Sequence, residues 1–252
     1  MIFDATDFIF EPAIEVTRAR RVLIKPAGAY PLPYPVTTSR ETLAAVIRGI
    51  RRVSDADIIL LEGPIEGEHA RSVYRSLGYD FPRVLGLDVR DCTLVEVENP
   101  LLKPYAMANF WIPNVLLSCD YLISVAPFRV RDGHGWLSCA NLLGLLPSTK
   151  YSEESGRERS ALSRFDIQSI ISDLYFTVPF DLGIIDARMK CVCSKDMTNG
   201  AIEEYGKVFV GEPLEFDEEA SVYTDTDTPH LQLISVAKDE MEAPFQDYAD
   251  ES

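Results

Sequence analysis

Short runs of aliphatic residues alternate with amphipathic segments along this chain of 252 residues, and this alternation restricts the fold more than any other feature. Buried strands are expected at residues 22–24, 58–61, 84–89, 94–97, 122–126, 182–186 and 208–210. Helices are expected at residues 38–50, 68–77, 136–146, 165–174, 214–221 and 230–238. Strands that alternate with helices form mainly parallel sheets, so the sequence predicts an α/β fold with helices on both faces of the sheet. Ligands of such folds bind at the carboxyl ends of the strands.

The first strand and helix enclose a predicted anion site. Lys25 ends the strand, and a proline-rich connection leads to Thr37, Thr38 and Ser39. Thr38 and Glu41 have the spacing of a capping box, which predicts a helix that begins there. The first N–H groups of a helix lack internal partners, so together with the three hydroxyls they would bind a phosphate or carboxylate that Lys25 neutralises. A helix cap beside a lysine that merely ends a strand is the alternative.

A second basic segment follows the strand at residues 122–126. Arg129, Arg131 and His134 lie close together there, and glycines flank the histidine. Arginine forks bind carboxylates and phosphates in a bidentate way, so these residues are candidates to close over an anionic ligand. The alternative is a surface loop whose arginines make exposed ion pairs.

Charge is concentrated at the end of the chain. Of its 40 acidic residues, 13 lie in residues 212–252 beside the single base Lys238, which leaves 27 acids and 23 bases in the rest. We therefore predict an α/β domain at residues 1–236 and an acidic, disordered tail at residues 237–252. The tail is a candidate site for a protein partner. Nucleic acid is not expected as a partner, because no basic stripe with interleaved aromatics occurs.

The cellular compartment is predicted from the absence of a membrane-spanning segment and of a secretory signal in this sequence. No apolar run approaches the ~20 residues that cross a bilayer, and the N-terminus carries acids where a secretory signal carries bases. We expect no membrane association and a cytoplasmic location. The five cysteines are odd in number and lie in apolar sequence, which indicates reduced thiols.

Signatures of metal sites and common enzyme classes are missing. Cys191 and Cys193 are too close for the usual zinc spacing, so no metal ligand is assigned. Walker, dinucleotide-binding and serine-hydrolase motifs are absent as well. Carboxylates end several strands, among them Glu62 and Asp186, but sequence does not tell which of them converge. Glu62 and His134 are the candidate proton carriers if the protein is an enzyme, and neither the reaction class nor a cofactor is predicted.

Several of these segments occur in an order that resembles a known family. They are LIKPAGAYPLPYPVTTSRETLAAVIRGI, ILLEGP, ISVAPFRVRDGHG and NLLGLLPSTK. Together they resemble the domain of unknown function 362 family over about residues 20–215. A fainter similarity is to the amino-terminal domain of the lactate racemase family, whose Asp-x-Thr-Arg motif is not found here.

The resemblance implies a site made of matching positions. These are Lys25, Thr37, Thr38, Glu62, Gly63, Arg129 or Arg131, Asn141, Gly144 and Lys150. Ala27 and Ala140 stand where the family has asparagine and lysine. Family members are often labelled iron–sulfur-centre proteins, which implies a redox-linked context, but this chain lacks a ferredoxin-like cysteine cassette.

Two functional hypotheses follow. In the first, the protein binds a phosphorylated or carboxylated cofactor or substrate at the carboxyl edge of its sheet. In the second, it is a non-catalytic binding or assembly module that acts through its acidic tail.

Overall fold

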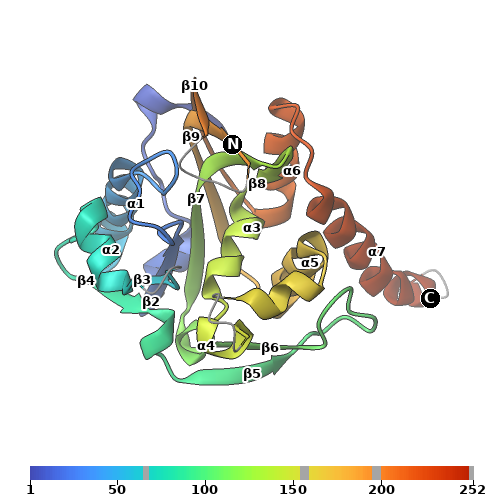
Figure 1. Ribbon diagram of the computed structural model, residues 1–252. Coiled ribbons are helices and arrows are strands. Elements are labelled where there is room, and N and C mark those ends of the chain that lie inside the picture. Colours follow the sequence, from blue (N-terminus) through green and yellow to red (C-terminus); the bar gives the residue numbers. More distant parts are fainter. Residues whose placement is uncertain (65–67, 154–158, 195–199, 250–252) are drawn as a thin grey trace.

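A computed structural model describes residues 1–64, 68–153, 159–194 and 200–249. One sheet of eight strands has the order β1-β10-β9-β7-β2-β3-β4, with β8 paired to β7 (Figure 1). Its strands are β1 Ile2–Asp4, β2 Arg21–Pro26, β3 Asp57–Glu62, β4 Val84–Asp88, β7 Tyr121–Arg131, β8 His134–Trp136, β9 Leu182–Cys193 and β10 Ala201–Gly211. The helices are α1 Arg40–Val53, α2 Ala70–Leu77, α3 Ser138–Asn141, α4 Ser148–Tyr151, α5 Ile167–Thr177, α6 Pro213–Tyr223 and α7 Pro229–Ala249.

The central strands are parallel, as the sequence predicts. β2 pairs in parallel with β3 and β7, and β7 in parallel with β9, while β10 and β1 add an antiparallel edge. Helices cover both faces: α1 and α2 lie on one side of the sheet, and α3 and α5 on the other (Figure 1). The α/β fold class is thereby confirmed.

Burial on both faces explains the continuous aliphatic runs. Val22 and Ile24 of β2 pack in a cluster with Leu43 and Val46 of α1, whereas Leu23 packs in the cluster on the opposite face that includes Ile170 of α5. Neighbouring residues of a strand point to opposite faces, so a strand covered on both sides needs apolar residues at every position. Because of this arrangement, charged side chains of β2 and β3 lie at the strand ends, while the small hydroxyl of Ser124 is accommodated inside β7.

The basic segment with Arg129 and Arg131 is part of a hairpin and not a surface loop. β7 continues to Arg131 and turns back as β8 through Asp132 and Gly133, whose φ angles are 51° and 86°. Two successive residues with positive φ make the tight turn of a two-residue hairpin, for which Asp-Gly is a favoured sequence. The hairpin places Arg129 and Arg131 on a strand.

Two other expectations are corrected. Residues 94–97 form β5 (Leu94–Glu98), which lies outside the main sheet and pairs with β6 (Asn109–Pro113), a strand that is not among those expected from the sequence. Residues 136–146 are not one helix: α3 has one turn and is followed by a 3₁₀ turn at Leu142–Leu145. Gly144 lies in that 3₁₀ turn, where glycine disfavours a continued α-helix and where a Cβ would clash with Lys25 of β2 and Glu62 of β3.

The C-terminal region is helical through Ala249, and the predicted boundary at residue 236 falls inside α7. The division of the chain into a domain and an acidic tail stays a prediction. In the described part of the chain, no helix is long and apolar enough to cross a membrane.

Candidate functional site

A buried ion pair joins the carboxyl ends of β2 and β3. Lys25 Nζ lies 2.8 Å from Glu62 Oε2, and the two side chains are 1% and 0% exposed. Nζ also donates to Pro26 O at 2.6 Å and to Asn141 Oδ1 at 3.3 Å. Three acceptors match the three N–H donors of an ammonium group. Burial lowers the pKa of Lys25, while Glu62 opposes that shift.

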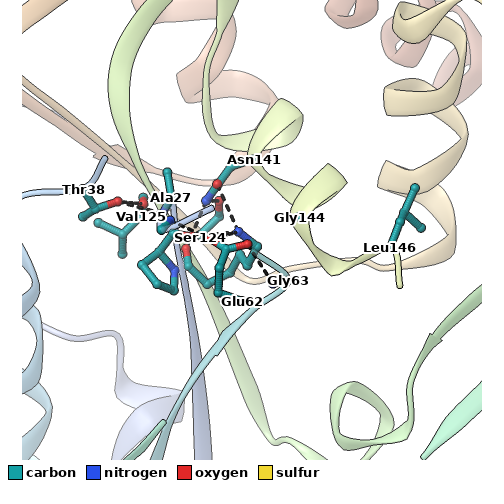
Figure 2. A network of polar contacts seen from close by, with 12 residues as sticks. Ala27, Thr38, Glu62, Gly63, Ser124, Val125, Asn141, Gly144 and Leu146 are labelled. Atoms are coloured by element: carbon teal, nitrogen blue, oxygen red, sulfur yellow. Dashed lines mark hydrogen bonds and ion pairs between the residues drawn. The ribbon is translucent and has the colours of Figure 1, made fainter. Parts of the chain in front are cut away.

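Asn141 connects this pair to the helical side of the sheet. Its Nδ2 donates to Lys25 O at 3.0 Å and to Ser124 Oγ at 3.1 Å (Figure 2). Ser124 Oγ in turn donates to Ser138 O at 2.9 Å. β2, β3, β7 and α3 are therefore held together by one polar network. Buried polar groups that are fully paired fix a single arrangement of the elements that carry them.

Gly144 packs directly on the ion pair. A Cβ at this position would lie 2.4 Å from Glu62 Oε1 and 2.6 Å from Lys25 Nζ. The guanidinium of Arg159 covers the same region, since its Nη2 donates to Gly63 O at 2.8 Å and to Gly144 O at 3.2 Å. Glycine is required at residue 144 because the backbone approaches two charged groups closely.

A pocket of about 80 Å³ opens beside the ion pair, and we call it the basic pocket. Its volume leaves room for an anionic group of a few heavy atoms. Among its charged side chains, four are basic and only Glu62 is acidic. Its lining consists of Lys25, Ala27, Ala29, Tyr30, Val36, Thr37, Glu62, Arg129, Arg131, Trp136, Ala140, Asn141, Leu143, Gly144 and Arg159.

Arg129 is the least satisfied cation of the basic pocket. It is 9% exposed, and no described carboxylate lies within ion-pair distance of its guanidinium. Nη1 donates to Val36 O at 3.2 Å, whereas Nε is buried and has no hydrogen-bond partner among the described residues. Burial lowers the pKa of Arg129, but an arginine stays charged in proteins. A buried charge without a counter-charge is costly, so an anion is strongly favoured here.

The start of α1 is filled by a carboxylate of the chain itself. Asp186 of β9 is fully buried and accepts from Ser39 Oγ and Thr42 Oγ1, both at 2.6 Å, and from Tyr34 OH at 3.0 Å. Arg188 Nη1 pairs with the same carboxylate at 2.9 Å. The anion that the helix start was predicted to attract is therefore present as Asp186.

The predicted capping box is wrong by one residue. Ser39 is the N-cap of α1, and its hydroxyl accepts from Thr42 N at 3.0 Å. Thr38 Oγ1 instead donates to Val125 O at 2.6 Å and accepts from Ala27 N at 2.8 Å. Thr37 Oγ1 donates to Leu32 O at 2.6 Å. Thr38 is needed for the loop between β2 and α1, which explains why it is not the cap.

The structure brings together only some of the predicted ligand residues. Those that line the basic pocket are Lys25, Thr37, Glu62, Arg129, Arg131, Asn141 and Gly144. Gly63 contributes its carbonyl to Arg159 beside it, while Thr38 and Ser39 lie behind the lining. The binding roles of all these residues stay predictions.

Two predicted residues lie elsewhere. His134 is not part of the lining, and its Nδ1 lies 2.9 Å from Asp227 Oδ2. Lys150 Nζ lies over the ring of Trp111, 3.7 Å from its centroid, and is also outside the lining. Neither position supports contact with a ligand in the basic pocket.

Sequence reasoning missed Tyr30, Trp136 and Arg159. Tyr30 lies in the proline-rich connection, where the sequence pattern marks only Lys25 and the hydroxyls of Thr37, Thr38 and Ser39 as ligand candidates. Arg159 follows Gly144 by fifteen residues in a polar segment, and no local pattern marks it. Arg159 contacts Gly63 and Gly144, which are distant in sequence, so these contacts depend on the tertiary structure.

A buried carboxylate behind the site, Asp217, makes the stability of the fold depend on pH. Asp217 of α6 accepts from Ser138 Oγ at 2.8 Å and Cys139 N at 2.9 Å, and so holds the start of α3, which carries Asn141. Burial raises the pKa of Asp217 to about 6. Because the folded pKa exceeds the unfolded value, the proton stabilises the fold at low pH, and that contribution is lost as pH rises through 6.

We expect the stability difference between the wild type and Asp217→Asn to change with pH. The wild type should gain on the order of 1 kcal/mol relative to the variant when pH is lowered from 7.5 to 5, because only the wild type takes up this proton. Urea unfolding of both proteins at the two pH values measures the change. A constant difference would show that Asp217 does not titrate in this range.

Comparison with known proteins places the chain in a family. No curated protein matches it. Among solved structures, the lactate racemase apoprotein from Thermoanaerobacterium thermosaccharolyticum is similar, with a TM-score of 0.53 and 15% identity over 87% of this chain and 53% of that one. The chain spans about half the length of that structure, and the likeness concerns the fold alone. One family model matches residues 22–220, and the chain therefore belongs to the family described as domain of unknown function (DUF362).

Proposed function

We propose that this protein binds a small molecule through a carboxylate or phosphate group in the basic pocket. The observation that carries the proposal is Arg129, a buried guanidinium that lines the pocket without a carboxylate partner among the described residues. The bidentate fork of an arginine suits both anions. The bound molecule would be a phosphorylated or carboxylated substrate or cofactor.

Other groups of the pocket support an anion rather than a cation. The only acidic side chain of the lining, Glu62, is already paired with Lys25 and accepts from Gly28 N at 2.6 Å and Gly63 N at 3.0 Å. Arg131 lies over Trp136, 5.0 Å from the ring centroid, and its Nε is 3.8 Å from Asp132. Arg129 and Arg131 are thus the charges that a ligand would meet.

The lining also has an apolar part, formed by Ala27, Ala29, Val36, Ala140 and Leu143. A ligand with a short apolar body beside its charged group would bury that body against these side chains. Ala27 and Ala140 also lie in the lining, at the positions where the family has asparagine and lysine. Methyl groups replace polar groups there, which supports a ligand that is less polar at this end. Glu62 is the one proposed proton carrier that lines this pocket.

Arg129→Met tests the proposal with a side chain of similar length and no charge. We expect the affinity for inorganic phosphate or acetate, measured by isothermal titration calorimetry at low ionic strength, to fall about tenfold or more. Arg164→Met is the control, because that arginine is 70% exposed and pairs with Glu153 away from the pocket. Equal affinities of the wild type and Arg129→Met, or no binding of either anion by the wild type, would overturn the proposal.

The alternative function, assembly through the acidic tail, concerns residues 237–252, and α7 is described only to Ala249. It stays a prediction, because no contact within the described residues favours it over binding in the basic pocket.

A further inference from the structure

A pair of thiols lies behind the basic pocket, on the strand next to Arg129. Cys191 and Cys193 of β9 are 1% and 7% exposed, and neither forms a disulfide. Residues two apart on a strand point to the same face, so both thiols lie on one side of β9. The two side chains lie close together, because a Cβ added at Gly200 would lie 3.0 Å from Cys191 Sγ and 3.2 Å from Cys193 Cβ.

Arg129 lies beside this pair on the neighbouring strand. β7 and β9 pair in parallel with Arg129 opposite Cys191 and Arg131 opposite Cys193. Both thiols interact electrostatically with the Arg129 guanidinium. Its Nε is buried without a hydrogen-bond partner in the described part of the chain, which leaves this guanidinium able to accept another negatively charged neighbour.

The number of donors restricts what such a pair can bind. Within the described residues, no group of three His, Cys, Asp or Glu side chains could hold a metal ion. Structural zinc needs four ligands, so the spacing is unsuited to it. Soft monovalent Cu(I) differs, because thiolates are its preferred ligands and two of them on opposite sides of the ion suffice.

We propose that Cys191 and Cys193 form a two-thiolate site for Cu(I), with Arg129 as its counter-charge. Binding releases two protons: two thiols and one Cu(I) give a bis-thiolate complex of charge −1 without any change of oxidation state. The guanidinium of Arg129 cancels that charge, which a buried complex requires. Gly200 packs against the pair, since a Cβ there would lie 3.0 Å from Cys191 Sγ.

The donor atoms also make the site selective. Thiolate sulfur is a soft ligand and favours Cu(I) over hard cations. Harder ions such as Mg²⁺ prefer oxygen ligands and would not compete.

Anaerobic titration of the full chain with Cu(I), buffered by a chromophoric Cu(I) chelator, tests the proposal. We expect one tightly bound Cu(I) per chain and a thiolate-to-copper absorption band in the ultraviolet. Cys191→Ser and Cys193→Ser should each lower the affinity at least about a hundredfold, since the ion loses one of its two ligands. The controls are Cys92→Ser and Cys119→Ser, which remove partly exposed thiols elsewhere and should retain it.

Arg129→Met separates this site from an ordinary pair of thiols. The variant keeps both cysteines, and its affinity for Cu(I) should fall about tenfold because the complex loses its counter-charge. Thermal unfolding of each variant checks that the fold is retained. Tight binding that survives the loss of both cysteines, or an Arg129→Met affinity equal to that of the wild type, would overturn the proposal. Phosphate binding by the Cys191→Ser/Cys193→Ser variant should be unaffected. Phosphate titration therefore tests the anion site alone, and Cu(I) titration tests the thiol site.

Discussion

Glu62→Ala is expected to lower the free energy of unfolding by about 3–5 kcal/mol, more than any other single substitution in the basic pocket. The substitution leaves the Lys25 ammonium buried without its carboxylate at 2.8 Å. It also removes the acceptor of Gly28 N and Gly63 N, two buried backbone donors. An uncompensated buried charge costs more than the pair contributes, because its desolvation is no longer offset. Urea unfolding at pH 7 measures the loss.

Glu96→Ala is a matched control for this prediction. Glu96 lies on β5 and is exposed, so its removal should change the stability by less than about 0.5 kcal/mol. The double variant Lys25→Met/Glu62→Leu should recover part of the loss, because neither charge remains buried alone. If Glu62→Ala unfolds as easily as Glu96→Ala, within about 1 kcal/mol, the ion pair is not buried in solution.

Asp186→Ala is expected to lower the free energy of unfolding by about 3 kcal/mol and to weaken anion binding as well. Asp186 ties β9 to the start of α1 through Ser39 and Thr42, and to the proline-rich loop through Tyr34. Its removal leaves several donors without an acceptor, and Arg188 then has only the exposed Glu41 carboxylate, 3.6 Å away. The same loop places Tyr30 and Val36 in the lining of the basic pocket, so the loss should reach the ligand.

Two controls define this result. Asp55→Ala removes a carboxylate that is 93% exposed and pairs with the exposed Arg83, and it should cost less than about 1 kcal/mol. Asp186→Asn keeps one acceptor oxygen and should lie between the wild type and Asp186→Ala. Phosphate titration of the three variants shows whether the loop affects the pocket. Normal stability of Asp186→Ala would contradict the contacts of this carboxylate.

The sequence determined the fold class and the edge of the sheet at which the site lies. Aliphatic runs such as 22–24 and 58–61 are continuous because both faces of β2 and β3 are covered, and that pattern is visible without coordinates. Lys25 and Glu62 end their strands, and parallel strands bring their carboxyl ends to one edge. Local periodicity sufficed for these predictions because it reflects burial directly.

Only the tertiary structure decided which polar groups meet. The hydroxyls of Thr37, Thr38 and Ser39 are predicted to bind an outside anion, yet Asp186, more than 140 residues later, accepts from Ser39 and from Thr42, which is not in that set. Arg159 reaches Gly63 and Gly144 from a segment with no recognisable motif. Local patterns record burial and backbone preference, whereas pairing between distant side chains depends on strand order and helix placement. That is why Arg129, one of several arginines in the sequence, is distinguished only in the folded chain, where burial leaves its charge without a carboxylate partner among the described residues.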